Sequence, residues 1–351
     1  MPFITHDEEQ ERRADPRRRL IPWAAALGAF LLGMALTLWL AREEHRRAEI
    51  EHRRAFVESA SGVVEAIEQQ LSDCERLIRT FQSVFLASMR VTEDDFRLVF
   101  ENLRDDRARV NLQALAYAER QVLDGRERYI TTIFMPVRGN EAIRGLDVGE
   151  QPSNLRSLIE SRDTNQVSMS APFKLRQSQG VNTAVDGFIL SLPLFADGAA
   201  PTTVADRRRT FVGSMGASFR TPNLITSVIP ADGGLVAEVA VDDVTDRLPR
   251  RLHHHRVGPA ASNEQHAQKI RFGGRTWLIT VLGARGAAMS PWLGRDLWLG
   301  VLMSALLAAL SWSLVSTRER ALLLARSMSE RYRASEERFR RLTELLPSLV
   351  L

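Results

Sequence analysis

Cysteine, long apolar runs and enzyme motifs are all scarce in this chain. Cys74 is the only cysteine among 351 residues, so no disulfide can form within one chain. Only two uncharged apolar runs are long enough to cross a bilayer, Leu20–Ala41 and Leu297–Ser316, which excludes a many-span transporter. The sequence also has no phosphate-binding glycine loop, no G-x-S-x-G serine motif and no kinase histidine box. No cluster of acid, base and nucleophile therefore marks a catalytic centre.

The two apolar runs divide the chain. As helices they would measure ~33 Å and ~30 Å at ~1.5 Å per residue, which is enough to span a membrane. The polar interval between them, Arg42–Arg295, is long enough to bury its own core. Basic residues stand outside both runs, as is usual for cytoplasmic flanks. They are Arg12, Arg13, Arg17, Arg18 and Arg19 before the first run, and Arg318, Arg320 and Arg326 after the second. We expect a two-span protein of the cell inner membrane, with both termini in the cytoplasm and the interval in the periplasm.

A cleaved signal peptide is the alternative for the first run. The run is longer than the ~7 to 15 apolar residues of such a segment, and Ala41-Arg42-Glu43 offers no small-x-small cleavage site. The net charge of +4 is explained by the membrane flanks. We therefore expect no nucleic-acid partner.

A heptad stripe follows the first run. Its apolar members are Val57, Ala60, Val64, Ile67, Leu71, Cys74, Ile78, Phe81 and Phe85, at alternating steps of four and three. The stripe predicts either a stalk helix over residues 42–90 that forms a homodimer, or an amphipathic helix that lies on its own domain. We favour the dimerising stalk. Cys74 is then a small buried hydrophobe, with an intersubunit disulfide as the alternative.

Short helices and strands fill the rest of the interval. Helix starts are predicted at Thr92-Glu93-Asp94-Asp95, at Pro152-Ser153-Asn154 and at Thr221-Pro222. Segments rich in β-branched or aromatic residues predict strands at 112–117, 129–135, 188–194, 211–219, 235–241, 269–272 and 276–282. Gly273-Gly274 predicts a hairpin turn between the last two. The fold class is α+β with antiparallel strands.

Two clusters of charged or titratable residues invite other interpretations. His253, His254 and His255 suggest a metal site, but consecutive strand residues cannot all point the same way, and no ligand spacing lies nearby. We expect a solvated loop there, no metal and no cofactor. Arg207–Arg209 predicts a surface loop before a strand, with an anionic ligand or lipid head group as the alternative.

A second heptad stripe follows the second run. Its members are Ala321, Ala325, Met328, Tyr332, Ser335, Phe339, Leu342 and Leu346. The pattern predicts a coiled coil that leaves the membrane on its inner side. Helices that enter and leave a membrane in this way are suited to transmitting a small shift or rotation.

Several blocks of the interval resemble one family. The first blocks are Phe81-Gln82-Ser83-Val84-Phe85-Leu86-Ala87-Ser88, Val91-Thr92, Asp95-Phe96 and Ala114-Leu115-Ala116-Tyr117-Ala118-Glu119-Arg120. Later blocks are Ser170-Ala171-Pro172-Phe173, Leu192-Pro193-Leu194-Phe195 and Ala217-Ser218-Phe219. Their order and spacing resemble the CHASE domain, an extracytoplasmic sensor of bacterial and plant receptor kinases and diguanylate cyclases. The segments Ser335-Glu336-Glu337-Arg338-Phe339-Arg340 and Leu345-Leu346-Pro347 resemble the entry to a PAS domain.

The resemblance implies a long stalk helix and two PAS-like antiparallel-sheet units, flanked by two transmembrane helices. The expected organisation is a cytoplasmic tail over 1–19, a span over 20–41, a sensor over 42–296, a span over 297–316 and a cytoplasmic coiled-coil linker with a truncated PAS start over 317–351. Within the sensor, the stalk covers 42–90, the membrane-distal unit about 91–220 and the membrane-proximal unit about 221–290.

The resemblance also implies a ligand site in the membrane-distal unit. In cytokinin-binding members an aspartate grips the adenine ring, and the matching position here is Asn154, which offers a donor and an acceptor but no charge. A bulky tyrosine of those receptors is replaced by Ser214. Other positions that match the pocket wall are Ser170, Phe173, Leu175, Ile189, Ser191 and Ala217. These residues predict a small organic ligand, with an adenine-like molecule as one candidate.

These features together predict a sensory receptor module without catalytic residues of its own. It would signal across the membrane to a histidine kinase or diguanylate cyclase, as a domain or as a partner. Two alternatives remain, a ligand-independent dimeric membrane scaffold and a tethered extracytoplasmic enzyme. A scaffold predicts a filled core, without a cavity between Asn154, Phe173 and Ser191.

Overall fold

The computed structural model describes residues 16–88, 91–103, 111–178, 186–196, 198, 201–229, 234–258, 261–284 and 291–345. The chain divides into two compact units, His52–Gly286 on one hand and Met1–Glu51 with Ala287–Leu351 on the other. Most of the tail over 1–19 and the last residues of the expected PAS start lie outside the described residues.

The described residues of the unit Met1–Glu51 with Ala287–Leu351 lie in two long helices. Helix α2 covers Pro16–Ala87 and helix α8 covers Pro291–Leu345. Both contain a stretch long and apolar enough to cross a membrane, within Leu20–Ala87 and Leu297–Arg340. The leucines of these stretches, such as Leu32 and Leu306, are exposed, as expected of side chains that face lipid.

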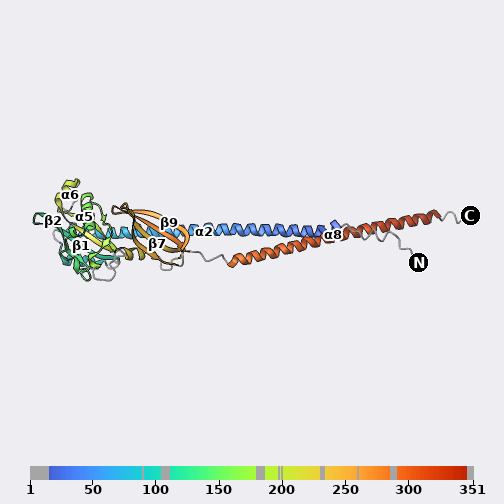
Figure 1. Ribbon diagram of the computed structural model, residues 1–351, viewed down its shortest axis with the longest axis horizontal. Coiled ribbons are helices and arrows are strands. Elements are labelled where there is room, and N and C mark those ends of the chain that lie inside the picture. The colour runs from blue at the N-terminus through green and yellow to red at the C-terminus, as the bar shows by residue number, and fades with distance from the viewer. Residues whose placement is uncertain are drawn as a thin grey trace. The chain divides into compact units, whose positions relative to one another are not determined.

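The unit His52–Gly286 contains two antiparallel sheets (Figure 1). The first sheet has the strand order β2-β1-β6-β5-β3, and β4 also pairs with β5. Its strands are β1 (Leu112–Leu123), β2 (Arg126–Met135), β3 (Ser168–Met169), β4 (Phe173–Lys174), β5 (Asp186–Phe195) and β6 (Phe211–Arg220). The second sheet has the order β8-β7-β10-β9. Its strands are β7 (Val236–Asp243), β8 (Arg250–Arg256), β9 (Ala261–Phe272) and β10 (Arg275–Ala284). The α+β class with two antiparallel sheets is therefore confirmed.

Short helices connect the strands. They are the α-helices α3 (Glu93–Asn102), α5 (Pro152–Thr164), α6 (Val204–Thr210) and α7 (Thr221–Thr226), and the 3-10 turns η1 (Glu141–Ile143), η2 (Val148–Glu150) and η3 (Arg176–Ser178). The Thr92 cap of α3 is a complete capping box with Asp95, as the sequence predicts. The prediction of a surface loop at Arg207–Arg209 is wrong. These arginines lie in α6, where the Thr203 hydroxyl accepts a hydrogen bond from the Asp206 amide at 3.1 Å and caps the helix.

Turn chemistry sets the register of two hairpins. Asp124 and Gly125 between β1 and β2 have φ values of 51° and 71°, and Gly273 and Gly274 between β9 and β10 have φ values of 55° and 79°. Two successive residues with positive φ make the tight turn whose twist matches a hairpin. The predicted Gly273-Gly274 hairpin is therefore confirmed.

The histidine segment is a strand and not the loop expected from the sequence. His253, His254 and His255 lie in β8, the edge strand of the second sheet. Their side chains alternate, so that His253 and His255 stack at 5.9 Å while His254 contacts Glu238 at 3.0 Å. Edge strands tolerate polar residues because one side of the ladder faces solvent. The sequence pattern lacked the apolar alternation of a central strand, and for that reason the strand was missed.

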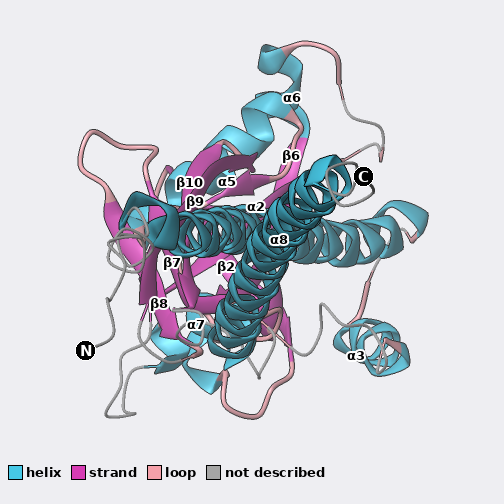
Figure 2. Ribbon diagram, turned by 90° about the vertical axis from the view of Figure 1, so that its right-hand side faces the viewer, coloured by secondary structure: helices cyan, strands magenta, loops and turns pink. Residues whose placement is uncertain are grey.

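The heptad stripe of α2 is buried by strands of its own chain. Ala60, Ile67 and Leu71 are at most 1% exposed and belong to one core with residues of both sheets, including Leu190 and Val239. Figure 2 shows strands on both sides of the end-on helix. The prediction that this stripe pairs with a second copy is therefore wrong. A period of 3.5 to 3.6 residues shows that one face of a helix is buried, but it does not show which surface buries that face.

Candidate ligand-binding site

A floor of very small side chains lies across the middle of the first sheet. Adjacent strands β1 and β6 place Ala114 opposite Ser218, Ala116 opposite Gly216 and Ala118 opposite Ser214. All six positions line one cavity. Successive strand residues point to opposite faces, so every second residue on both strands faces this side. Because none of the six is larger than serine, the sheet presents a flat surface.

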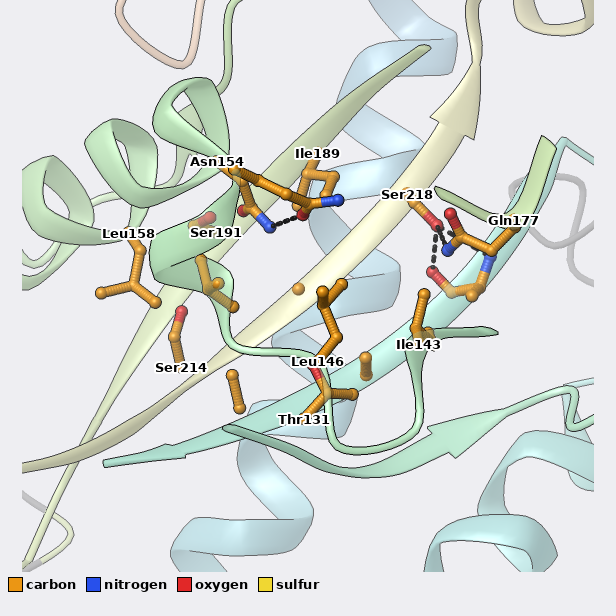
Figure 3. A pocket seen from close by; sticks show the side chains of 16 residues that line it. Thr131, Ile143, Leu146, Asn154, Leu158, Gln177, Ile189, Ser191, Ser214 and Ser218 are labelled. Carbon is orange, nitrogen blue, oxygen red and sulfur yellow. Dashed lines mark hydrogen bonds between the residues drawn. The ribbon is translucent and has the colours of Figure 1, made fainter. Parts of the chain in front are cut away.

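Walls rise around this floor from several elements (Figure 3). Asn154 and Leu158 come from α5, and Ile189 and Ser191 come from β5. The remaining lining residues are Thr131 of β2, Gln177 of η3, and Ile143, Leu146, Val148 and Gln151 between β2 and α5. The cavity has an empty volume of about 510 Å³, which includes its open mouth.

Helix α5 is held over the floor by packing and by hydroxyl groups. Pro152 stands in its first turn, where its missing N–H costs no hydrogen bond. Ser157 donates to the Asn154 carbonyl at 2.8 Å, and its oxygen lies 3.1 Å from that of Ser191 on β5. Leu158 joins an apolar cluster with Phe195 and Phe211. Asn154 is thereby directed from the start of the helix into the cavity.

The polar groups of the cavity are partly used within the chain. Asn154 Nδ2 donates to Gln151 Oε1 at 3.0 Å, while Asn154 Oδ1 receives no hydrogen bond from the described residues. Ser218 Oγ donates to the Ala114 carbonyl at 3.1 Å and accepts from the Ala114 amide at 3.0 Å. Gln177 Nε2 lies 3.5 Å from Ser218 Oγ, at the limit of a hydrogen bond. The amides of Asn154 and Gln177 are therefore the groups most able to turn toward a bound molecule.

No charge faces the cavity from its sixteen lining residues. Two charged residues adjoin lining residues in sequence, Glu150 beside Gln151 and Arg176 beside Gln177. Arg176 Nη2 lies 2.5 Å from Glu150 Oε2, so these two charges neutralise each other. The described lining of the cavity therefore carries no charge.

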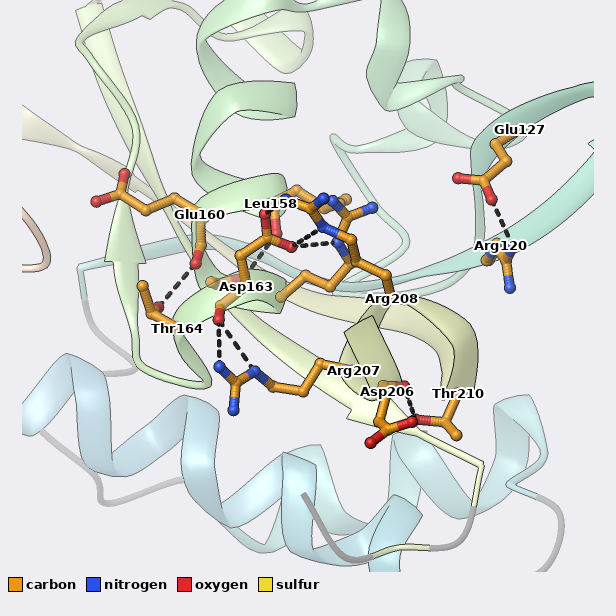
Figure 4. Close-up of polar contacts among 12 residues, drawn as sticks. Arg120, Glu127, Leu158, Glu160, Asp163, Thr164, Asp206, Arg207, Arg208 and Thr210 are labelled. Carbon is orange, nitrogen blue, oxygen red and sulfur yellow. Dashed lines mark hydrogen bonds and ion pairs between the residues drawn. The ribbon is translucent and has the colours of Figure 1, made fainter. Parts of the chain in front are cut away.

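The far end of α5 is anchored by α6 (Figure 4). Arg207 donates from Nε and Nη2 to the Asp163 carbonyl at 3.0 and 2.7 Å, which satisfies an acceptor at the helix C-terminus. Arg208 binds the Asp163 carboxylate through Nε and Nη2 at 3.1 and 2.5 Å. These bonds, assisted by Arg162, lower the pKa of Asp163 to about 2 against a smaller opposing effect of burial. The three arginine side chains thus serve the helix that covers the cavity.

The structure brings four of the eight sequence-predicted site residues to the cavity. These are Asn154, Ile189, Ser191 and Ser214. Their role in binding stays a prediction.

The other four predicted residues lie elsewhere. Ser170 supports the wall, because its hydroxyl accepts a hydrogen bond from the Ile189 amide at 3.0 Å. Phe173 pairs with Gly187 through β4, and Leu175 packs close to the same glycine. Ala217 is fully buried on the opposite face of β6, where it packs in the core shared with α2. None of these four lines the cavity, so a direct contact with a ligand is not supported for them.

Several lining residues were missed by sequence reasoning. Ala114, Ala116 and Ala118 could have been found from strand alternation, once Tyr117 was assigned to the other face. Thr131 and Gln177 carried no such signal. Gln177 reaches the cavity from a 3-10 turn that only the tertiary fold places there.

Metal chemistry finds no support in the described part of the chain. No group of three or more histidine, cysteine, aspartate or glutamate side chains there has an arrangement that could hold a metal ion.

Residues 89–253 match the family model of the CHASE domain. This CHASE domain spans the first sheet, the cavity and the beginning of the second sheet. The resemblance drawn from the sequence is confirmed, and the chain carries a sensory ligand-binding module of the extracytoplasmic type. A comparison with curated proteins gives no match.

Solved structures similar to this chain include two chemoreceptor sensory domains. One is the ligand-binding domain of the Pseudomonas aeruginosa PAO1 amino acid chemoreceptor PctC in complex with GABA, with a TM-score of 0.41, 12% identity, and coverage of 67% of this chain and 99% of that one. The other is the sensory domain of the Campylobacter jejuni chemoreceptor Tlp3 with isoleucine bound, with a TM-score of 0.33, 11% identity, and coverage of 65% and 94%. The ligand of this chain does not follow from similarities this low.

Proposed function

We propose that this chain is a membrane-bound receptor module that binds a small, flat, uncharged organic molecule in the cavity of its CHASE domain. It would transmit the binding event to a cytoplasmic output domain or partner of the histidine kinase or diguanylate cyclase type. The observation that carries the proposal is the neutral cavity over the Ala116–Gly216 floor.

The floor supports a flat ligand. A planar ring laid on a sheet contacts several strands at once only if no side chain projects beneath it. The pairs Ala116–Gly216 and Ala118–Ser214 provide that surface. Leu158 above and Ile189 beside the floor supply apolar contact to the faces and edges of such a ring. Dispersion and burial of apolar area then favour binding.

The absence of charge among the lining residues supports a neutral ligand. Burying an ionised carboxylate or ammonium without a partner costs far more than a hydrogen bond can return. Free amino acids carry both groups at neutral pH. An adenine-like heterocycle carries neither, and the Asn154 amide can offer its ring one donor and one acceptor. We therefore place adenine-like molecules ahead of amino acids as candidates.

A chain of contacts leads from the cavity to the second sheet. Leu158 lines the cavity, and Glu160 follows it on α5. Glu160 Oε2 accepts a hydrogen bond from Ser168 Oγ of β3 at 3.0 Å. An added Cβ at Gly274 would lie 2.8 Å from Glu160 Oε1, so the β9–β10 turn sits directly against this carboxylate. A displacement of α5 by a ligand would therefore be felt at the turn that precedes β10.

The two sheets are also joined by main-chain and aromatic contacts. The Met169 amide of β3 donates to the Gly273 carbonyl at 2.7 Å, and Phe188 of β5 meets Trp277 of β10 edge to face at 5.5 Å. Strand β10 is the last strand before α8 in the chain. A ligand can bias this route only by binding two arrangements unequally. With the arginine-rich flanks in the cytoplasm, as proposed, such a bias would reach the inner side.

The cavity favours this proposal over its two alternatives, a scaffold and an enzyme. A ligand-independent scaffold has no need for an open, uniformly small-residue floor in an otherwise close-packed domain. A tethered enzyme needs an acid, base or nucleophile, and the described lining residues offer only amides and hydroxyls beside apolar groups.

Thermal unfolding of a segment over residues 42–295 tests the proposal. We expect the unfolding temperature to rise with at least one member of a library of adenine derivatives and other neutral heterocycles. At a hundred times its Kd, such a ligand adds about 2.7 kcal/mol to the free energy of unfolding. Free amino acids and GABA serve as charged comparators. Gly216→Leu should abolish the shift, because its side chain fills the floor. Val212→Leu, at an exposed position of the same strand, should retain it.

Two outcomes would contradict the proposal. One is no shift with any neutral compound together with a clear shift by an amino acid. The other is a shift that survives Gly216→Leu unchanged, which would place the ligand elsewhere.

A further inference from the structure

Two histidines of β8 are stacked at the edge of the buried face of the second sheet. His253 and His255 pair in register with Val241 and Val239 of β7. Directly paired residues of antiparallel strands project to the same face, and both valines are fully buried. The two imidazoles therefore lie on the inner side of the sheet, with ring centroids 5.9 Å apart and ring planes inclined by 16°.

Helix α7 rests against this pair of histidines. It lies beside β8 (Figure 2), and His253 Nε2 is 3.1 Å from the Thr226 hydroxyl of α7. In the chain, α7 directly follows β6, one of the two strands of the cavity floor, and precedes β7 of the second sheet. Leu224 and Ile225 of α7 are fully buried in the core that contains strands of both sheets. The contact between α7 and β8 is therefore a joint between the floor strand and the second sheet.

The carboxylates of the neighbouring strand β7 are engaged elsewhere. Glu238 and Asp242 belong to the outer face of the sheet, where they bind arginines of β8 and, through Glu238, His254. Asp243 belongs to the inner face, but it is paired with Arg275 of β10. None of these carboxylates forms an ion pair with either stacked histidine.

The other elements around β8 supply no compensating charge. Helix α7 has no ionisable side chain, and the buried side chains that α2 contributes to the same core are uncharged. Arg250 of β8 donates to the Pro172 carbonyl at 2.6 Å. Among the described residues, neither His253 nor His255 has an ion-pair partner.

The fold therefore opposes protonation of this pair. Burial, and then the neighbouring His255 and His254, lower the pKa of His253 below its ordinary value of 6.5. Neutral His253 thus stabilises the fold above about pH 6.5, and this contribution is lost as the pH falls. When both rings are charged, they repel one another across 5.9 Å. The hydrogen bond to Thr226 does not oppose protonation, because an imidazole nitrogen accepts from a hydroxyl when neutral and donates to it when charged.

We propose that the stacked pair His253–His255 makes the joint between α7 and β8 sensitive to pH, so that the joint is closed when both rings are neutral and loosens when both are charged. Histidine is the side chain whose charge ordinarily changes between about pH 5 and 8. Because α7 connects the floor strand β6 to the second sheet, loosening the joint weakens one connection between the cavity and that sheet. The inference is independent of any ligand of the CHASE domain.

Hydrogen exchange of the full chain in detergent micelles, followed by mass spectrometry at about pH 7.5 and about pH 5, tests the inference. Each observed rate is divided by the intrinsic exchange rate at that pH. We expect the protection of amides over residues 221–229 and 250–256 to fall several-fold at the lower pH, while strands β1 and β6 keep theirs. Unchanged protection in both segments, or an equal fall throughout the domain, would overturn the proposal.

Substitutions within β8 test whether the stacked pair is the cause. His253→Gln and His255→Gln should each remove most of the fall in protection, since the remaining ring then has no charge to repel. His254→Gln is the matched control on the outer face of the same strand and should keep the fall. His255→Arg should loosen the joint already at about pH 7.5, because it sets a permanent charge beside His253. A fall that persists in both glutamine variants of the pair, or that disappears in His254→Gln, would contradict the assignment.

Discussion

The side-chain oxygens of Ser157 and Ser191 lie 3.1 Å apart and tie helix α5 to strand β5 beside the cavity. Ser157 already donates its hydroxyl proton to the Asn154 carbonyl at 2.8 Å, so Ser191 is the donor in the pair. Both serines are 2% exposed. The helix that covers the site is therefore positioned by buried neutral hydrogen bonds, which suits a cavity without charge.

Adjacent residues of β6 should respond in opposite ways to enlargement. Gly216→Ala adds a methyl group that meets Ile189 at an ordinary contact distance of 3.6 Å and otherwise enters the cavity, so stability should be unchanged or rise slightly. Ala217→Leu overfills the core beneath the floor and should cost about 1–3 kcal/mol. Urea unfolding of the two variants measures the difference. Equal destabilisation would contradict the assignment of the two faces.

The α2 stripe should behave as a domain core and not as a dimer seam. Leu71→Ala should lower the free energy of unfolding by about 2–5 kcal/mol, because Leu71 is 1% exposed among residues of the sheets. Val57→Ala should cost little, since Val57 on the same stripe is 40% exposed. Unfolding that depends on protein concentration, with similar losses in both variants, would instead support a dimer along the stripe.

A buried ion pair anchors the start of β10. Arg275 Nε lies 2.5 Å from Asp243 Oδ2, and these side chains are 9% and 2% exposed. Arg275→Met should cost about 3–5 kcal/mol, because it leaves the Asp243 carboxylate buried without its partner. The double variant Arg275→Met with Asp243→Leu should recover much of the loss. A double-mutant cycle by urea unfolding measures this coupling, and purely additive losses would argue against it.

The lowered pKa of Asp163 predicts that the stability of the folded protein decreases at acid pH. Its pKa in the folded protein is lowered to about 2 from 3.8 by Arg208 and then Arg162, so its contribution is complete above about pH 4 and is lost as the pH falls toward about 2. The gap between the urea midpoints of the native chain and Asp163→Asn should therefore be constant above about pH 4 and close below it. Arg208→Ala should shrink the gap above about pH 4, where the Asp163 carboxylate is ionised. A gap that persists unchanged to about pH 2 would show that Asp163 is not stabilised in this way.

The contact between Gly274 and Glu160 can be tested with a matched glycine. Gly274→Ala introduces both backbone strain at a φ of +79° and a Cβ 2.8 Å from the Glu160 carboxylate. Gly234→Ala introduces similar strain at a φ of +49° with no atom within 4 Å. Hydrogen exchange of the Met169 amide, which donates to Gly273, should accelerate in the first variant and not in the second. Equal acceleration would mean that strain alone loosens the turn.

Local pattern predicted the elements of this fold well. Apolar spacing located α2, capping residues located α3, and β-branched content located the central strands of both sheets. These features depend on residues close in sequence, so a single chain reveals them. Strand β8 was missed because an edge strand needs no apolar alternation, and α6 was missed because its helix is short and highly charged.

The tertiary structure decided which surfaces pack against one another. The sequence by itself determined that α2 has a buried stripe, that antiparallel sheets follow it and that the chain carries CHASE-like blocks. It did not determine that the stripe packs on strands, or that Ala114 and Ser218, which are 104 residues apart, join to form a cavity floor. Periodicity reports that a face is covered, while the identity of the cover depends on contacts between distant segments that no local pattern contains.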